Sequence, residues 1–313
     1  MSILITGGLG VIAARLIEAL SEHGHHPIGF DLRTHPGSIS GDIRDPERVH
    51  NALHNCTGIV HLAAVSRVHH GEADPDLCWQ TNVSGTRNVL AAALASPWRP
   101  WVLLASSREV YGEPDALPAN EDAPLRPVNH YGRSKLAAEA LAWEARAKGL
   151  RVAVVRMSNV YGSPDDHPDR VIPAFARAAV ADEPLQVRGE NSIFDFIHID
   201  DVLSGLLSIM QLLEQGEDTL PPLLLSSGRG TTLIEVAHLA QQAAGMRGRI
   251  MKLPPAAGHV TRFVGDSTRT AALLGWKLRV SLEEGIHRLV GAFERRQPGN
   301  QTTRHHALVR GQL

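Results

Sequence analysis

Short apolar segments alternate with helical segments through the first half of this chain, and that alternation limits the folds open to it. Strands are expected at residues 2–6, 26–31, 57–64, 99–107 and 150–162. Helices are expected between them, at residues 11–24, 45–55, 74–96 and 129–149. Strands that are apolar on both faces and alternate with helices predict a parallel sheet covered on both sides. The predicted fold class is therefore α/β, a doubly wound Rossmann sheet with its ligand at the carboxyl ends of the strands.

The pattern becomes less regular after about residue 162. Short strands are expected at residues 185–189, 192–200 and 222–227, and helices at residues 171–182, 201–216, 231–245 and 281–296. We expect a Rossmann domain with the cofactor and catalytic residues over 1–162, and a smaller mixed α/β lobe, mainly substrate-binding, over 163–296. Residues 297–313 lack periodicity and are expected to form a flexible tail.

Charge and composition exclude several classes of protein. The 313 residues carry a net charge of −2, so no basic field invites nucleic acid. No apolar run reaches the length of a membrane span, and no cleavable leader fits before the first strand. We therefore expect a cytoplasmic enzyme. Two cysteines, Cys56 and Cys78, are too few for a disulfide framework, and no histidine spacing predicts a metal site.

The glycine-rich segment after the first strand predicts a dinucleotide site. Gly7 permits a tight turn, Gly10 lets the backbone approach a pyrophosphate, and Ala13 lets the following helix pack closely on the strand. Asp31 ends the second strand, where a carboxylate accepts hydrogen bonds from ribose hydroxyls and repels a 2′-phosphate, so NAD is favoured over NADP. Asp42 is a candidate for the adenine. The residues expected to bind the cofactor are Gly7, Gly10, Val11, Ile12, Asp31, Leu32, Asp42, Ile43, Leu62, Ala63, Ala64, Ser66, Ser106, Tyr131 and Lys135.

Tyr131 and Lys135 form a candidate catalytic pair, because residues four apart lie on one face of a helix. A phenol with a pKa near 10 is a poor base at neutral pH. A lysine ammonium and a positively charged nicotinamide both favour the phenolate, and bringing the pKa near 7 takes roughly 4 kcal/mol. Ser107, after the fourth strand, is expected to hydrogen-bond the reacting hydroxyl.

Taken together, the motifs resemble those of the extended short-chain dehydrogenase/reductase family of nucleotide-sugar epimerases and dehydratases. The segments that carry the likeness are "TGGLGVIA", "HLAA", "TNVSGT", "SSREVYG", "YGRSK", "NVYG" and "GDSTRTAALLGW", in this order to about residue 295. The resemblance implies Ser107, Tyr131 and Lys135 as the catalytic set. It also implies Asn82 near the nicotinamide and Asn159 as a cofactor or substrate contact.

The same resemblance implies a reaction cycle and an assembly. A hydride is taken from a sugar C4 hydroxyl and later returned, so NAD is regenerated in place. A homodimer is implied through the long helices that contain Trp79 and Trp143.

Glu109 and Arg108 suggest a chemistry beyond simple oxidation. A C4 ketone acidifies the neighbouring C–H bonds, and Glu109 is a candidate to remove such a proton. Its position resembles that of the glutamate in dehydratases and uronate decarboxylases of the family. Glu109 is otherwise a loop ion-pair partner for Arg108. Arg108 departs from the aspartate that hexose 4,6-dehydratases often carry, and an arginine cannot act as a general acid. It is a candidate substrate contact.

Phe194 is a second departure from the family pattern, which usually has an arginine on the substrate diphosphate at this place. Arg188 and Arg262 could supply the lost contact. Alternatively the substrate is a nucleoside-like sugar without a diphosphate, and Phe194 offers it an apolar wall.

The leading hypothesis is an NAD-dependent sugar dehydratase that works through a transient keto-sugar, with 5,6-elimination preferred over 4,6-dehydration. The alternatives are a 4-epimerase acting on UDP-glucose or UDP-glucuronate, a net sugar dehydrogenase or reductase, and a non-catalytic dinucleotide sensor. The expected ligand is in each enzymatic case a small sugar.

Overall fold

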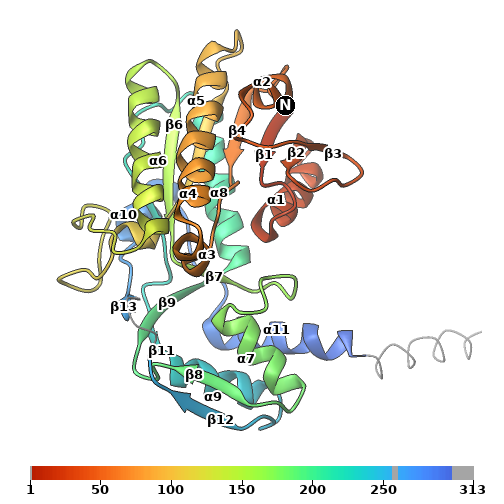
Figure 1. Ribbon diagram of the computed structural model, residues 1–313, viewed down its shortest axis with the longest axis vertical. Helices are drawn as coiled ribbons and strands as arrows, with labels where there is room; N and C mark the ends of the chain where they lie inside the picture. Colours follow the sequence, from red (N-terminus) through yellow and green to blue (C-terminus); the bar gives the residue numbers. More distant parts are fainter. Residues whose placement is uncertain (1, 256–259, 298–313) are drawn as a thin grey trace, which may run out of the picture.

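The computed structural model describes residues 2–255 and 260–297, so most of the expected tail lies outside the described residues. Its large sheet has seven parallel strands in the order β10-β6-β5-β4-β1-β2-β3 (Figure 1). These strands are β1 (Ser2–Thr6), β2 (His26–Asp31), β3 (Ser38–Ser40), β4 (Gly58–His61), β5 (Trp101–Ser107), β6 (Val152–Met157) and β10 (Leu223–Leu225). The chain reverses direction across the sheet between β1 and β4, which is where such folds bind their ligands.

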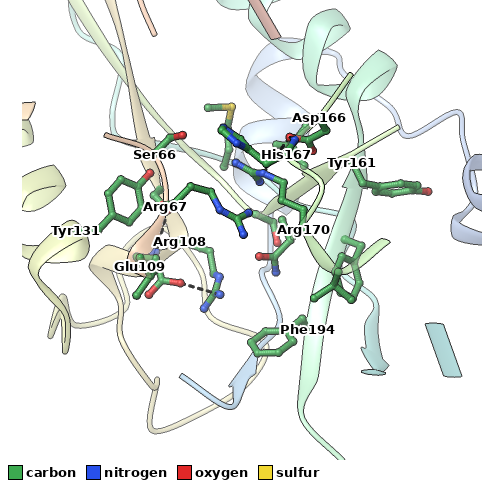
Figure 2. A pocket seen from close by; sticks show the side chains of 18 of the residues that line it. Ser66, Arg67, Arg108, Glu109, Tyr131, Tyr161, Asp166, His167, Arg170 and Phe194 are labelled. Atoms are coloured by element: carbon green, nitrogen blue, oxygen red, sulfur yellow. Dashed lines mark hydrogen bonds and ion pairs between the residues drawn. The ribbon is translucent and has the colours of Figure 1, made fainter. Parts of the chain in front are cut away.

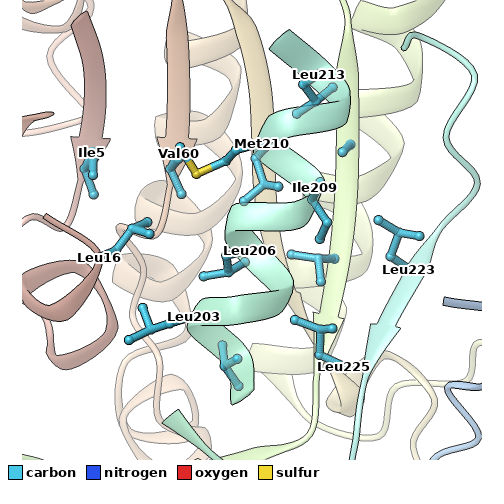
Figure 3. Close-up of a cluster of buried hydrophobic side chains, with 14 of the residues drawn as sticks. Ile5, Leu16, Val60, Leu203, Leu206, Ile209, Met210, Leu213, Leu223 and Leu225 are labelled. Carbon is cyan, nitrogen blue, oxygen red and sulfur yellow. The ribbon is translucent and has the colours of Figure 1, made fainter. Parts of the chain in front are cut away.

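Helices cover both faces of this sheet, as the continuous apolar strands predict. One face packs against α2 (Pro46–Ala52), α5 (Thr86–Ala95) and α6 (His130–Ala147), and the other against α1 (Val11–Glu22) and α8 (Ile199–Glu214). Alternate residues of β5 serve the two cores: Leu103 packs on the α8 side and Leu104 on the opposite side. Figure 3 shows the α8 side, where Leu206 and Met210 lie over the strands.

A smaller lobe lies beyond the carboxyl ends of the large sheet (Figure 1). It contains a four-stranded sheet of β7 (Asn159–Tyr161), β9 (Ile193–His198), β11 (Gly230–Thr232) and β13 (Arg262–Phe263), and a pair of β8 (Leu185–Arg188) and β12 (Ile250–Leu253). Its core is packed by α7 (Val171–Val180), α9 (Leu233–Ala243) and α11 (Leu282–Arg296). The doubly wound sheet with a smaller mixed lobe is thus confirmed.

Two expected elements are broken in the structure. The strand expected at 150–162 becomes β6 and β7 with Ser158 between them; the Ser158 amide donates to the Leu225 carbonyl of β10 at 3.0 Å, and its hydroxyl donates to the Asp195 carbonyl of β9 at 2.7 Å. The helix expected at 74–96 is three pieces: α4 (Pro75–Trp79), the π-helical turn η1 (Gln80–Gly85) and α5. A π-helical turn contains one extra residue but keeps the general polar and apolar pattern of a helix, so the spacing of apolar residues in the sequence does not reveal it.

The domain boundary expected at residue 162 does not separate the large sheet from the smaller lobe. Helix α8 and strand β10 lie beyond it in the sequence, yet both pack with the large sheet. Short elements that carry little periodicity were not expected at all: α3 (Val68–Ala73), the 3₁₀ turn η2 (Arg108–Val110), β3, β11, β12 and β13. The segment "GDSTRTAALLGW", which carries part of the family likeness, contains the helix α10 (Thr268–Leu274).

Surface and thiol features complete the description. Cys56 and Cys78 are both buried free thiols. None of the helices within the described ranges has the length and apolarity needed to cross a bilayer. Trp79 is 49% exposed, whereas Trp143 packs partly against the core, and the implied homodimer stays a prediction.

Candidate active site

A cavity of about 480 Å³ lies between the carboxyl ends of the large sheet and the smaller lobe. Its walls come from the turn after β1, the segments after β4 and β5, the start of α6, the β7–α7 loop, and strands β8 and β9. Figure 2 shows Tyr131 and Glu109 on one side of this space and Phe194 on the other. Residues that the sequence placed in two regions therefore share one site.

The glycine turn has the shape that a dinucleotide requires. Gly7 has a φ of +69°, and a Cβ at this position would lie 2.9 Å from the backbone of Ala63. Helix α1 begins after Gly10 without a side-chain cap, so its first N–H groups and its positive end are open to an anion. The tight glycine turn and the open start of α1 therefore fit the NAD pyrophosphate.

Two carboxylates beyond this turn are held by their own neighbours. Asp31 accepts hydrogen bonds from the Leu9 amide at 3.0 Å and from Arg33 Nε at 3.1 Å. Burial raises the pKa of Asp31, but these hydrogen bonds outweigh it and leave the pKa below its ordinary value. Arg44 Nε donates to Asp42 at 2.8 Å and lowers the pKa of that carboxyl. Both groups are thus anionic acceptors suited to an adenosine.

The expected cofactor residues divide into two sets. Those that line the cavity are Gly7, Gly10, Val11, Ile12, Leu62, Ala64, Ser66, Ser106, Tyr131, Lys135 and Asn159. Those that lie outside its lining are Asp31, Leu32, Asp42, Ile43, Ala63 and Asn82. Asn82 is 1% exposed, and its side chain binds the backbone of Val65 and the hydroxyl of Ser134. It therefore holds the loop after β4, and a direct contact with the nicotinamide stays a prediction.

Tyr131, Lys135 and Ser107 converge on the cavity as expected. Lys135 Nζ donates to the Ala105 carbonyl at 2.9 Å, and an ammonium has two further N–H groups. Burial lowers the pKa of Lys135 to about 8. Burial also raises the pKa of Tyr131 to about 12, against a smaller lowering by the Ser107 hydrogen bond and the Arg170 charge. Among the protein's own groups burial therefore outweighs these two contributions, and the expected lowering of the pKa by Lys135 together with a bound nicotinamide stays a prediction.

The start of α6 fixes the position of the catalytic tyrosine. Asn129 caps this helix, and its side-chain oxygen accepts the Gly132 amide at 2.7 Å. A Cβ on Gly132 would lie 2.6 Å from the Glu109 carbonyl oxygen. Glycine beside Tyr131 thus lets the helix touch the turn that carries Glu109.

Glu109 and Arg108 form a buried pair in the cavity wall. Arg108 Nη2 lies 2.7 Å from Glu109 Oε1, and Asn129 Nδ2 donates to Glu109 Oε2 at 2.7 Å. Their side chains are 10% and 8% exposed. The carboxylate is therefore held in one orientation on the same wall as Tyr131.

Phe194 lies opposite, and Arg108 stacks on it. The Arg108 guanidinium carbon is 5.0 Å from the centre of the Phe194 ring, a cation–π geometry. A cation thus lies over the ring at the position where the resemblance implies an arginine. Arg188 lines the cavity, while Arg262 is exposed and lies outside its lining, so its expected phosphate contact stays a prediction.

Comparison with known proteins places this site in a family. The model of the NAD dependent epimerase/dehydratase family matches residues 3–220. The chain belongs to this family. It is 30% identical to the putative UDP-glucose 4-epimerase of Methanocaldococcus jannaschii, over 92% of this chain and 97% of that protein.

Two solved structures have the same fold as this chain. MoeE5, solved with NAD and either UDP-glucose or UDP-glucuronic acid, is 29% identical, with TM-scores of 0.85 and 0.86, over 95% of this chain and 99% of that one. DesIV, a dTDP-glucose 4,6-dehydratase from Streptomyces venezuelae solved with NAD, is 27% identical, with a TM-score of 0.85, over 96% of this chain and 98% of that one. The expected family and the expected cofactor, NAD, are confirmed.

Sequence reasoning missed three side chains of this epimerase/dehydratase site. Asn129 was readable as a helix cap, but its second contact, to Glu109, needs the fold. Arg67 and Arg170 line the cavity from loops that follow β4 and precede α7. Their only sequence signal is an arginine in a loop near the carboxyl ends of the strands.

A buried ion pair supports the site from behind. Arg156 binds Glu139 through Nε at 3.0 Å and Nη2 at 2.7 Å, and the Ser106 hydroxyl also donates to Glu139. Both charged side chains are at most 3% exposed. This network ties α6 to β5 and β6.

Replacing Glu139 with alanine is expected to lower the free energy of unfolding by about 3–5 kcal/mol, because it leaves the buried Arg156 guanidinium without its carboxylate partner. Urea denaturation measures this loss. Glu144→Ala, at an exposed position of the same helix, serves as the control and should change stability by less than about 0.5 kcal/mol. Equal losses in the two variants would contradict the assigned role.

Proposed function

We propose that this chain is a sugar dehydratase that works through a transient keto-sugar and regenerates its NAD in place. The observation that carries the proposal is the position of Glu109. Its carboxylate lines the same cavity as Ser107, Tyr131 and Lys135, and Arg108 and Asn129 hold it there. A site for oxidation alone has no use for that oriented carboxylate.

In the proposed cycle, Tyr131 accepts the proton of a sugar hydroxyl that Ser107 aligns. NAD, when bound, would supply the acceptor and later the donor of the hydride at that carbon, and a positive ring charge that favours the phenolate. Lys135, protonated below a pKa of about 8, donates to the Ala105 carbonyl and keeps its charge beside the reacting groups. The result of this first step is a ketone.

The second step is elimination. Glu109 accepts a proton from the carbon next to the ketone, and the hydroxyl on the following carbon leaves as water after it takes up a proton. Arg108 keeps its proton and cannot supply it, so the same Glu109 carboxyl delivers it. A hydroxyl at C6 gives a 5,6-alkene once the ketone is reduced again. The net change is the loss of one water.

A 4-epimerase is the second candidate, and a specific contact favours it. Both Glu109 oxygens already accept hydrogen bonds or an ion pair, from Asn129 and Arg108, as expected of a structural carboxylate. The relative from M. jannaschii carries an epimerase name, whereas DesIV is a dehydratase. We further propose a nucleotide-sugar or nucleoside-like sugar as the substrate, since Phe194 stands where the family's phosphate-binding arginine is usual.

Product analysis tests the function. NAD-loaded protein is incubated with UDP-glucose, UDP-galactose, UDP-glucuronate and dTDP-glucose, and the products are measured by mass. A loss of 18 mass units with no lasting absorbance of reduced nicotinamide supports the dehydratase. An unchanged mass with a new stereoisomer supports the epimerase instead, and steady accumulation of reduced nicotinamide supports a net dehydrogenase.

A further inference from the structure

The lining of the cavity carries more positively than negatively charged side chains, and the proposed chemistry gives no role to Arg67 or Arg170. Its cationic lining residues are Arg67, Arg108, Lys135, Arg170 and Arg188, and its carboxylates are Glu109 and Asp166. Asp169, which pairs with Arg67, adds a third negative charge at the edge. The balance stays positive by two charges. Because the same lining includes the glycine turn assigned to the NAD pyrophosphate, the charge balance alone does not identify a further ligand, and the hydrogen-bond partners of the arginines decide the question.

Three of these arginines have N–H groups without acceptors. Arg67 Nε, Arg108 Nη1 and Arg170 Nε are buried atoms that hydrogen-bond to nothing in the described part of the protein. Arg108 as a whole is 8% exposed. A buried charged donor without a partner costs free energy, and a ligand that accepts its hydrogen bond recovers it.

The existing ion pairs do not satisfy these side chains. Arg67 Nη2 lies 2.7 Å from Asp169, which leaves its Nε free. Arg170 Nε lies 3.1 Å from Asp166 Oδ1, but the N–H does not point at the oxygen, so the pair is not a hydrogen bond. Each guanidinium has five N–H donors, so both can still bind an oxyanion.

The surroundings of Arg67 and Arg170 make their charges unfavourable without a ligand. Arg170 is the first residue before α7, where the positive end of the helix repels a cation. Burial and the Arg170 charge both lower the pKa of Arg67. An anion between the two would remove this repulsion.

The two arginines lie at the reacting end of the cavity. Figure 2 shows Arg67 between Tyr131 and Arg170, and the charge of Arg170 acts on the Tyr131 phenol. A group bound here is therefore part of the sugar that reacts at Tyr131. It is distinct from a diphosphate, which a nucleotide-sugar carries at the anomeric carbon.

We propose that Arg67 and Arg170 bind an anionic substituent of the reacting sugar, so that the substrate is an acidic sugar. The shared chemistry is an oxyanion that accepts two or more charge-assisted hydrogen bonds, either a carboxylate at C6 or a phosphate ester. Arg108, stacked on Phe194, bounds the same space. This inference rests on the proposed function, and it deepens that proposal by assigning a substrate class. A C6 carboxylate would leave no C6 hydroxyl, and elimination would then run toward C2.

Binding tests the inference without turnover. Every protein is prepared as Tyr131→Phe and saturated with NAD, and matched acidic and neutral ligands are titrated by calorimetry. The pairs are UDP-glucuronate with UDP-glucose, 4-nitrophenyl β-D-glucuronide with the glucoside, and glucose 6-phosphate with glucose. The first two pairs test a carboxylate with and without a nucleotide, and the third tests a phosphate.

We expect the acidic member of at least one pair to bind about tenfold to a hundredfold more tightly than its neutral partner. Arg67→Gln and Arg170→Gln should each reduce that ratio toward one with little effect on the neutral ligand. Arg126→Gln, which removes an exposed arginine paired with Asp115, should leave the ratio unchanged.

Three results would overturn the inference. They are equal binding of acidic and neutral ligands in all pairs, no binding by any acidic ligand, and a preference that survives both substitutions. A parallel loss of both ligands in the variants would also count against it, because it indicates a purely structural role. Since nothing here requires product, tight acid binding without dehydration would contradict only the proposed reaction.

Discussion

Replacing Tyr131 with phenylalanine is expected to reduce kcat by about a thousandfold or more, while the affinity for NAD changes by no more than a few-fold. The substitution removes one hydroxyl and keeps the ring that fills the cavity wall, where Tyr131 is 8% exposed. Without the phenol, the sugar hydroxyl loses the base that Tyr131 supplies in the proposed cycle. Turnover is measured by product mass, and NAD affinity by fluorescence titration.

The pH dependence of the unchanged enzyme separates this role from a structural one. Burial holds the Tyr131 pKa at about 12, so the phenol keeps its proton at neutral pH unless the bound cofactor lowers that value. A base must be deprotonated to work, so kcat/KM should rise with pH through the acid side of the profile. The phenylalanine variant should lose that rise. A variant with more than a tenth of the original kcat would remove Tyr131 from the mechanism.

Replacing Glu109 with glutamine is expected to reduce dehydration by about a hundredfold to ten-thousandfold, the usual contribution of a general base. Glutamine keeps the shape and an oxygen for Asn129, but it cannot take a proton. Oxidation of the sugar does not need Glu109, so transient reduction of NAD in a single turnover should persist. Stopped-flow absorbance follows that step, and mass spectrometry follows the loss of water.

Asp115→Asn is the matched control for this variant. Asp115 is also a carboxylate paired with an arginine, at 3.0 Å from Arg126, but its side chain is 75% exposed and lies outside the cavity lining. It should retain full dehydration. If Glu109→Gln dehydrates as fast as this control, Glu109 serves only to pair with Arg108. Intact interconversion of C4 epimers in Glu109→Gln would instead favour the epimerase.

Much of the fold was predictable because its information is local. Strand β2 begins and ends at the expected residues, His26–Asp31, and α1 starts at Val11 directly after the glycine turn. Each depends on periodicity and on a glycine within the same segment. The break at Ser158 was not predictable, because its hydroxyl and the strand after it bind β9, where the Asp195 carbonyl lies 37 residues away in the chain.

In the candidate site, too, the residues with a local sequence signal were predictable, and those whose role depends on distant contacts were not. Ser107, Tyr131 and Lys135 follow from motif order, and all three line the cavity. The raised phenol pKa follows from burial, which a sequence does not state. The roles of Asn129, Arg67 and Arg170 depend on what lies opposite them across the cavity, and that is a property of the folded chain alone.

The π-helical turn η1 has a consequence for how this chain tolerates insertion and deletion. Its extra residue sets the direction of the Asn82 side chain, which hydrogen-bonds to the backbone of Val65. Val65 precedes Ser66 and Arg67, which line the cavity. Each residue of a helix turns its neighbours by about 100°, so losing one residue between Gln80 and Gly85 would swing that amide away from its loop. Such a shortened helix would still pack as a helix, and the damage would surface as weaker ligand binding in a folded protein. The length of this turn therefore matters to ligand binding through the loop that Asn82 holds.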